Sequence, residues 1–218
     1  MVRCVLGLGG PRSADFPLRR AHVGRAFVEH VAKAHGFPAW RPASGALADL
    51  SEHGSGLVLC RLWPEGGLAT GEAGGQAARR CLLYLGIRSL AHVAIVHAEP
   101  RKLCGQFALV EGAEMTPLWA KGVVDAFAGS KALRQLLRLQ IGVGSRGRGN
   151  TAPTLEEFGE AQLHARDATT VVESVFPQAY ETLQKRWFGP GAITEGKLQQ
   201  RVLVKDLRRG ALKLPERP

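Results

Sequence analysis

The apolar residues of this chain fall into short runs that alternate between two spacings. Continuous or every-second-residue apolar runs predict β-strands at residues 3–8, 46–50, 57–62, 91–97, 106–110 and 137–143. Apolar residues at helical spacing predict helices at residues 24–35, 75–85, 118–128 and 169–187. Because strands and helices alternate along the chain, the pattern predicts an α/β fold, a single domain with a mostly parallel, twisted sheet flanked by helices. We assign this domain to residues 1–189 and a basic C-terminal extension to residues 190–218.

The composition favours a folded domain with an excess of positive charge. Of 218 residues, 45% are hydrophobic and 22% are charged, which suits a packed core and excludes a wholly disordered chain. No apolar run reaches the ~18 residues of a membrane span, so no membrane partner is expected. The net charge of +10 favours a polyanionic partner such as RNA or DNA. The alternative is a solvated basic surface without a partner.

Positive charge is concentrated in two segments. Residues 126–155 contain no acidic residue, and the tail beyond residue 190 is rich in Lys and Arg. Such segments can follow a phosphate backbone. We therefore predict RNA contacts in the first segment from Lys131, Arg134, Arg138, Arg146 and Arg148. In the tail we predict a second anchor made by Lys197, Arg201, Lys205, Arg208 and Arg209.

No motif in the sequence predicts a cofactor or a metal. The glycines of residues 7–10 follow a strand, but Arg12 replaces the third glycine of a dinucleotide-binding turn. The chain has no P-loop, nucleophile elbow or metalloprotease motif. A zinc ribbon, a thioredoxin-type site and a disulfide scaffold are disfavoured because no C-x-x-C pair occurs among the four scattered cysteines, Cys4, Cys60, Cys81 and Cys104.

The order of several motifs resembles the bacterial-type peptidyl-tRNA hydrolase family. Residues 5–11 followed by residues 20–24 resemble its opening, where G-L-G-N-P-G leads to T-R-H-N-x-G. Residues 97–99 (His-Ala-Glu) stand at its H-D-E motif, residues 121–123 (Lys-Gly-Val) at its N-G-L motif, and residues 138–144 at R-L-R-I-G-I-G. The resemblance covers roughly residues 3–189 and implies a peptidyl-tRNA hydrolase-like fold.

The resemblance also implies a chemistry that this chain departs from. Enzymes of that family cleave the ester between a peptide and tRNA with a histidine base, an orienting aspartate and asparagines that hold substrate and water. The positions that match these groups carry other residues, namely Gly10, Ala21, Glu72, Ala98 and Lys121. A one-residue gap places His22, the remaining candidate base, on the histidine. Because losing an orienting carboxylate costs a factor of about 10⁴ in rate, we predict an inactive site.

These observations lead to a functional expectation with two rivals. We expect a catalytically inactive peptidyl-tRNA hydrolase-like protein that binds structured RNA, either rRNA or a tRNA acceptor stem. Lys121 adds positive charge to the former cleft. The expected setting is a ribosomal large subunit or its assembly, with ribosomal or assembly proteins as partners.

The expected location is mitochondrial and the alternative is cytoplasmic, since the sequence runs into its first strand without a conventional presequence. One rival is an active hydrolase that uses His22 with Glu99 or Glu72 as its carboxylate partner. The other is a protein-interaction module that uses the old peptide groove.

Overall fold

Four parallel strands form the centre of the sheet in this computed structural model, which describes residues 2–10, 18–63, 71–114, 116, 118–144 and 161–189. The sheet has seven strands in the order β2-β3-β4-β1-β5-β7-β6. They are β1 (Arg3–Gly7), β2 (Arg41–Ala43), β3 (Ala48–Glu52), β4 (Leu57–Leu62), β5 (Val93–Leu103), β6 (Phe107–Glu111) and β7 (Leu137–Gly144). Strands β4, β1, β5 and β7 run parallel, whereas β2, β3 and β6 add antiparallel edges.

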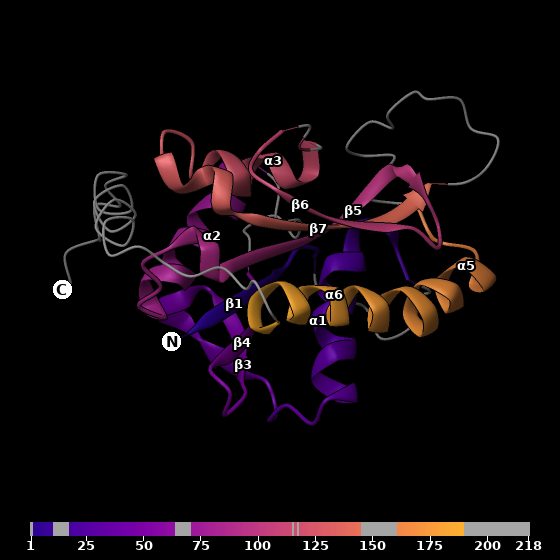
Figure 1. The fold of residues 1–218 in the computed structure, drawn as a ribbon, viewed down its shortest axis with the longest axis horizontal. Helices are drawn as coiled ribbons and strands as arrows, with labels where there is room; N and C mark the ends of the chain where they lie inside the picture. Colours follow the sequence, from indigo (N-terminus) through magenta and orange to yellow (C-terminus); the bar gives the residue numbers. More distant parts are fainter. Residues whose placement is uncertain are drawn as a thin grey trace.

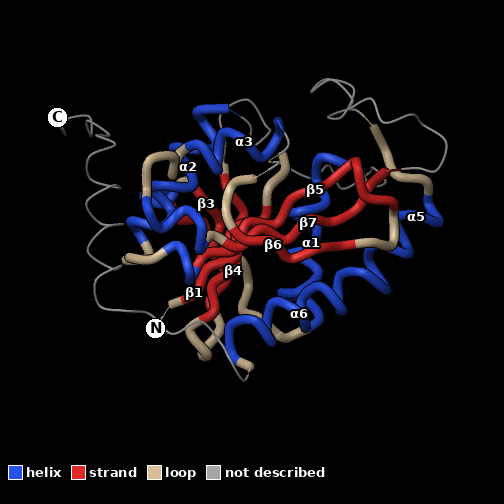
Figure 2. Tube along the Cα trace, turned by 45° about the horizontal axis from the view of Figure 1, so that its top comes forward, coloured by secondary structure: helices blue, strands red, loops and turns tan. Residues whose placement is uncertain are grey.

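Helices cover both faces of this sheet. The longer helices are α1 (Val23–Ala34), α2 (Gly71–Tyr84), α3 (Leu118–Asp125), α5 (Ala165–Thr170) and α6 (Phe176–Phe188). A π-helical turn at Val171–Val175 (η5) joins α5 to α6, and 3₁₀ turns stand at Arg20–His22 (η1), Ser44–Ala46 (η2), Leu90–His92 (η3) and Lys131–Gln135 (η4). Figures 1 and 2 show α1 and α6 together on one side of the sheet and α2 and α3 on the other.

The predicted fold class is confirmed, and each predicted strand and helix overlaps an element of the structure. The predicted strands at residues 46–50 and 91–97 begin on the 3₁₀ turns η2 and η3, and the predicted helix at residues 169–187 is divided by the π-helical turn η5. The sequence pattern did not indicate the short strand β2, in which two of the three residues are exposed. It also gave β5 as ending at residue 97, whereas the strand continues to Leu103 through polar residues that pair with β7. The predicted extension at residues 190–218 lies outside the described residues. Within the described part of the chain, no helix is long and apolar enough to cross a membrane.

Close backbone contact holds α1 against the sheet. A Cβ atom on Gly24 would lie only 2.1 Å from the carbonyl oxygen of Val96 and 2.7 Å from that of Leu8. Only glycine allows this approach, so the first turn of α1 packs directly on the ends of β1 and β5. On its outer side α1 packs against α6, where the Phe27 and Phe176 rings meet edge to face at 5.4 Å.

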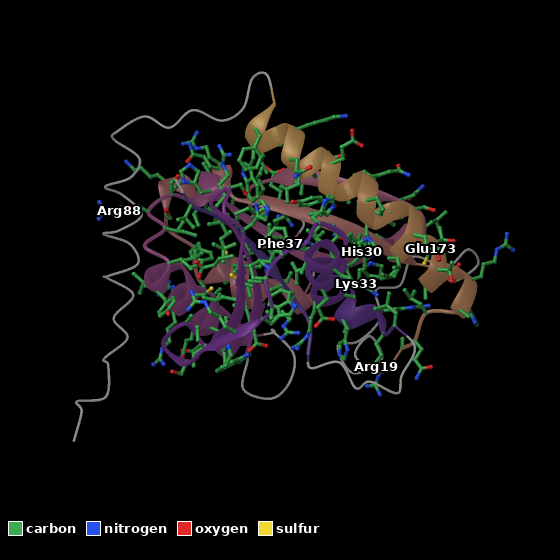
Figure 3. All side chains as sticks on the ribbon, turned by 90° about the horizontal axis from the view of Figure 1, so that it is seen from below. Arg19, His30, Lys33, Phe37, Arg88 and Glu173 are labelled. Atoms are coloured by element: carbon green, nitrogen blue, oxygen red, sulfur yellow. The ribbon has the colours of Figure 1, made fainter. Side chains whose placement is uncertain are left out.

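Side chains fill the layers on either side of the sheet (Figure 3). On the α1 side, the ring of His30 lies 5.5 Å from that of Phe176, so this histidine packs between α1 and α6 (Figure 3). The buried indole of Trp187 donates from Nε1 to the carbonyl of Ala91 at 3.0 Å, which ties the end of α6 to the chain just before β5. On the other face, Gly75 of α2 packs against the backbone of Gly122 in α3.

Candidate functional site

The candidate site lies where β1 ends beside Val96 of the parallel strand β5 and α1 begins. After β1 the chain turns at Gly9, whose φ is +148°. A Cβ atom there would meet the Cα of His22 at 2.8 Å and the carbonyl oxygen of Ala21 at 3.0 Å. The glycine turn therefore lets η1 pack against the end of β1. It places His22, the N-cap of α1, at the carboxyl edge of the sheet.

Ala21 and His22, the two positions that the resemblance offers for the family's catalytic histidine, differ in exposure. Ala21 is buried, whereas His22 is only partly buried. Gly10, at the position of the family's first asparagine, is also buried and brings no side-chain amide. The structure therefore brings His22 and Gly10 to the same edge of the sheet.

Ala98 and Glu99 point to opposite faces of β5. Gly7 pairs with Val96, and a Cβ on Gly7 would meet Val28 of α1, so Val96 faces α1. Because side chains alternate along a strand, Ala98 also faces the α1 side, and Glu99 faces the side of α2 and α3. Ala98, at the position of the family's aspartate, therefore presents only a methyl group to the α1 side. The carboxylate of the next residue, Glu99, points to the opposite face.

The carboxylate of Glu99 is engaged by Arg101. Arg101 donates from Nε to Oε1 at 2.7 Å and from Nη2 to Oε2 at 2.8 Å, and its backbone N–H also donates to Oε1 at 3.2 Å. Burial of Glu99 opposes ionisation, but these bonds outweigh it and hold the pKa of Glu99 below its ordinary value. Glu99 is therefore ionised and already paired. A search for opposite charges at i and i+2 on one strand would have found this pair in the sequence.

His97 lies on the same side of β5 as Glu99 and is completely buried. Its Nδ1 lies 2.8 Å from the carbonyl oxygen of Ala98, whereas Nε2 has no hydrogen-bond partner. Burial lowers the pKa of His97 to about 4, although the bond to the Ala98 carbonyl works in the opposite direction. His97 is therefore neutral at pH 7 and belongs to the core.

Glu72 and Lys121 lie on adjacent helices beside this edge. Glu72 is in the first turn of α2 and is exposed, and Gln76 donates from Nε2 to its Oε1 at 3.2 Å. The half-exposed Lys121 of α3 forms an ion pair with Asp125 at 2.5 Å. The two helices themselves are in contact, because Gly75 of α2 packs against Gly122 of α3. Both residues make local, solvent-exposed contacts.

Two of the predicted RNA contacts, Lys131 and Arg134, lie away from the candidate site. Lys131 and Arg134 are exposed in η4, just before β7. Because Leu137 of β7 pairs with Ala94 near the start of β5, η4 lies at the edge of the sheet opposite to Ala98. The other predicted contacts, Arg146, Arg148, Lys197, Arg201, Lys205, Arg208 and Arg209, lie outside the described residues.

The structure corrects the expectation that Arg138 offers its guanidinium at the surface. Arg138 is 1% exposed and donates from Nε to the carbonyl of Gly112 and from Nη2 to that of Glu114, each at 2.5 Å. Its Nη1 is buried without a hydrogen-bond partner. Arg138 also lines a cavity of about 380 Å³ together with Arg101 and Lys102. Arg138 pairs with Ile95 of β5, and since Ile95 is one residue before Val96, Arg138 faces the α2 and α3 side of the sheet, as Glu99 does.

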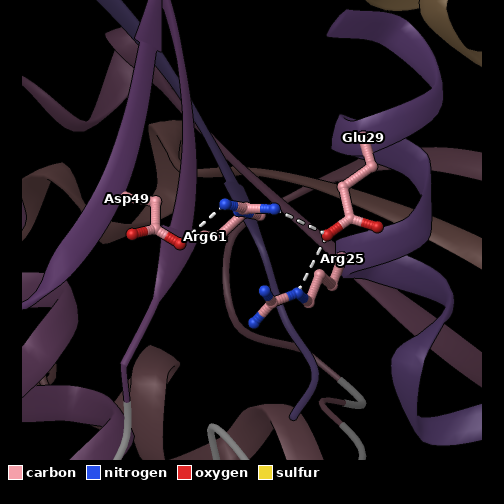
Figure 4. Close-up of polar contacts among 4 residues, drawn as sticks. All are labelled: Arg25, Glu29, Asp49 and Arg61. Atoms are coloured by element: carbon pink, nitrogen blue, oxygen red, sulfur yellow. Dashed lines mark hydrogen bonds and ion pairs between the residues drawn. The ribbon is translucent and has the colours of Figure 1, made fainter. Parts of the chain in front are cut away.

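A four-residue ion network lies beside α1, on the side of the sheet that Ala98 faces (Figure 4). Glu29 accepts from Arg25 Nε and from Arg61 Nη1, both at 3.0 Å. Arg61 also donates to Asp49 at 2.8 Å and stacks over the ring of Trp40 at 4.2 Å. Two carboxylates on this side of the sheet are therefore engaged by arginines. The network connects α1 to β3 and β4.

Comparison with solved structures shows which known proteins share this fold. One peptidyl-tRNA hydrolase, in complex with N-propanol, superposes with a TM-score of 0.66 at 16% identity, covering 98% of this chain and 96% of the other. The enzyme from Acinetobacter baumannii gives a TM-score of 0.66 at 16% identity over 85% of this chain and 90% of the other. Its Arg119Gln mutant gives 0.64 at 13% identity over 96% and 92%.

This chain has the peptidyl-tRNA hydrolase fold. At 13–16% identity the likeness concerns the fold alone. No protein-family model and no curated protein matches the sequence. Within the peptidyl-tRNA hydrolase fold, the candidate site described above stands at the carboxyl edge of β1 and β5, beside the start of α1.

Proposed function

We propose that this chain is a catalytically inactive protein with the peptidyl-tRNA hydrolase fold that binds structured RNA. Its proposed setting is the large subunit of a mitochondrial ribosome, as a component or as an assembly factor with ribosomal or assembly proteins as partners. Three solved structures of peptidyl-tRNA hydrolases share this fold, and the net charge of +10 suits an RNA partner.

The pairing of Glu99 with Arg101 carries the argument against hydrolysis. A histidine base needs a carboxylate that fixes its tautomer, and its loss costs about 10⁴ in rate in a comparable triad. Ala98 supplies none on the side facing α1, while Glu99 faces the other side and is held by Arg101. Glu72, the second carboxylate of the rival hypothesis, is exposed and bonded to Gln76.

The cavity around Arg138 supports an anionic partner. Of its three acidic residues, Glu99 is paired with Arg101 and Glu111 accepts from Arg186, so most of the negative charge is already neutralised. Arg138 Nη1 remains a buried donor without a partner, which is costly unless a ligand or water satisfies it. A phosphate group of RNA would meet Arg101 and Lys102, which line the same cavity and are not buried.

A turnover assay separates the proposal from the hydrolase rival. The full-length protein is incubated with peptidyl-tRNA, next to an active peptidyl-tRNA hydrolase as positive control. We expect no release of peptide above the uncatalysed rate, and the same result for His22→Ala. Turnover that disappears in His22→Ala would establish the rival, in which His22 is the base.

Co-purification tests the RNA partner and the setting. The tagged protein is recovered from cells at low salt, and its bound RNA and proteins are identified. We expect rRNA of the mitochondrial large subunit together with ribosomal or assembly proteins. Free tRNA alone would exclude the ribosomal setting, and protein partners that stay bound after ribonuclease treatment, with no RNA recovered, would support the protein-interaction module.

A further inference from the structure

Three cysteines that are far apart in the sequence meet in the core. Cys4 Sγ lies 3.3 Å from Cys60 Sγ, and Cys60 Sγ lies 3.5 Å from Cys81 Sγ. All three sulphurs lie within 4.8 Å of one another, and all three residues are 0% exposed. The fourth cysteine, Cys104, is only partly buried and is not part of this group. The spacing of 56 and 21 residues gave no sign of the cluster in the sequence.

Three separate elements hold these thiols in place. Cys4 is on β1 and Cys60 on the adjacent strand β4, where Leu6 pairs with Cys60. The two cysteines are therefore two positions apart along the same face of the sheet. Cys81 comes from α2, which packs on that face. Because strands and helix are fixed by the surrounding core, the sulphurs are arranged before any ligand binds.

The distances disfavour a tetrahedral metal such as zinc. Zinc–sulphur bonds of about 2.3 Å with tetrahedral angles separate the sulphurs by about 3.8 Å, and structural zinc takes four ligands. Here two of the separations are 3.3 and 3.5 Å, and the group that the described residues form contains three ligands. Trivalent arsenic binds three thiolates in a steep pyramid whose S–As–S angles are smaller than tetrahedral, which holds the sulphurs closer together than a tetrahedral metal does.

Charge also favours a trivalent ligand. All three sulphurs are completely buried, so a complex that leaves net negative charge in the core is costly. Three thiolates around a divalent ion carry a charge of −1, and around a monovalent ion −2. Around a trivalent atom they carry none. Only the trivalent complex is neutral with all three sulphurs bound.

We propose that Cys4, Cys60 and Cys81 form a binding site for a trivalent thiophilic metalloid, taken up as neutral arsenous acid. Three S–H bonds and three As–O bonds break, and three As–S bonds form. The three protons and three hydroxyl groups leave as three water molecules. Nothing is oxidised or reduced, and neither the incoming ligand nor the complex brings charge into the core. Because the sulphurs are buried, binding requires a transient separation of α2 from β1 and β4.

Thiol counting and intact mass test the proposal on the whole protein. The reduced protein is incubated with arsenite, excess reagent is removed, and thiols are titrated in denaturant while the mass is measured in parallel. We expect the reactive thiols to fall from four to one, with a mass gain of one arsenic less three hydrogens. X-ray absorption should show three sulphur neighbours around arsenic. Four reactive thiols after prolonged incubation would overturn the proposal.

Variants and other metals complete the test. Cys104→Ser is the matched control and should still take up one arsenic, with its thiols falling from three to zero. Cys81→Ser should lose the three-sulphur signal, and its thermal melt checks that it folds. The wild-type result decides the matter even if that variant fails to fold. Loss of uptake in Cys104→Ser, or stoichiometric three-sulphur binding of Zn²⁺ or Cu⁺ without arsenite uptake, would overturn the proposal.

Discussion

Arg101 holds both carboxylate oxygens of Glu99, two residues back on β5, with donors at 2.7 and 2.8 Å. The Glu99 side chain is 2% exposed and that of Arg101 is 44% exposed. The pair therefore joins a buried anion to a cation that still reaches water. Such an arrangement lowers the cost of burying the carboxylate because only one partner gives up its hydration. It also leaves both oxygens of the Glu99 carboxylate, next to Ala98, bonded to Arg101.

Removing the Arg101 guanidinium should reduce stability, because the buried Glu99 carboxylate would then lack a charged partner. We expect Arg101→Ala to lower the free energy of unfolding at pH 7 by about 2 kcal/mol, because a buried carboxylate loses its charged donors. Wild-type Glu99 has a lowered pKa, so its contribution is present above the ordinary glutamate pKa and is lost as the pH falls through the folded value. Urea unfolding at several pH values measures both effects.

The neighbouring Lys102 provides the control for this measurement. Lys102→Ala removes the same charge from β5 without touching Glu99 and should change the stability by no more than about 0.5 kcal/mol. In Arg101→Ala, acid protonates the unpaired carboxylate, so the deficit should shrink below about pH 4. A deficit that stays constant from pH 7 to pH 3 would contradict this role of the pair.

His97 should make the protein sensitive to acid. Burial lowers its pKa from 6.5 to about 4, so the unfolded chain binds a proton more readily than the folded chain between these values. Stability should therefore fall by about 3 kcal/mol as the pH drops from 6.5 to 4. We expect His97→Gln to lack this part of the pH dependence.

The exposed His53 serves as the control for His97. His53→Gln removes a histidine at a surface turn and should leave the pH dependence of stability between pH 6.5 and 4 as in the wild type. Denaturant midpoints at matched pH values compare the three proteins. An unchanged slope in His97→Gln would show that other groups cause the acid sensitivity.

Gly24 should tolerate no side chain. A methyl group there would lie 2.1 Å from the Val96 carbonyl oxygen, and we expect Gly24→Ala to cost about 3 kcal/mol through displacement of α1 from β1 and β5. The better helix propensity of alanine offsets at most about 1 kcal/mol. Gly54→Ala, which has nothing within 4 Å of the added atom, should change stability little. Equal thermal melting temperatures for the two variants would refute this packing.

RNA binding should depend steeply on salt. Each phosphate contact adds about 0.7–0.9 to the slope of log affinity against log salt, so Lys131→Gln and Arg134→Gln should each lower the slope by about that amount. Lys33→Gln removes the same charge from the exposed side of α1 (Figure 3) and should leave the slope unchanged. Titrations with rRNA fragments at several salt concentrations measure the slopes. Equal effects of all three variants would indicate only a general charge effect.

The sequence by itself determined the elements and the class of the fold. The apolar run at residues 91–97 and the helical spacing at residues 24–35 depend on neighbours in the chain, and the structure places β5 and α1 there. The sequence also predicted the glycine turn before His22, because the motifs that contain the turn and the histidine follow one another along the chain. Local periodicity reflects which side of an element is buried, and that information is present in a single segment.

Only the tertiary structure decided which distant residues meet. Cys4, Cys60 and Cys81 converge because β1 lies between β4 and β5 and α2 covers that face, an order that no local pattern encodes. The sequence predicted that Arg138, in a basic segment, would contact RNA. In the structure its side chain is buried on the α2 and α3 side of the sheet and donates to two backbone carbonyls. Strand order sets these contacts, because a sheet joins segments whose separation along the chain carries no information about their distance in space.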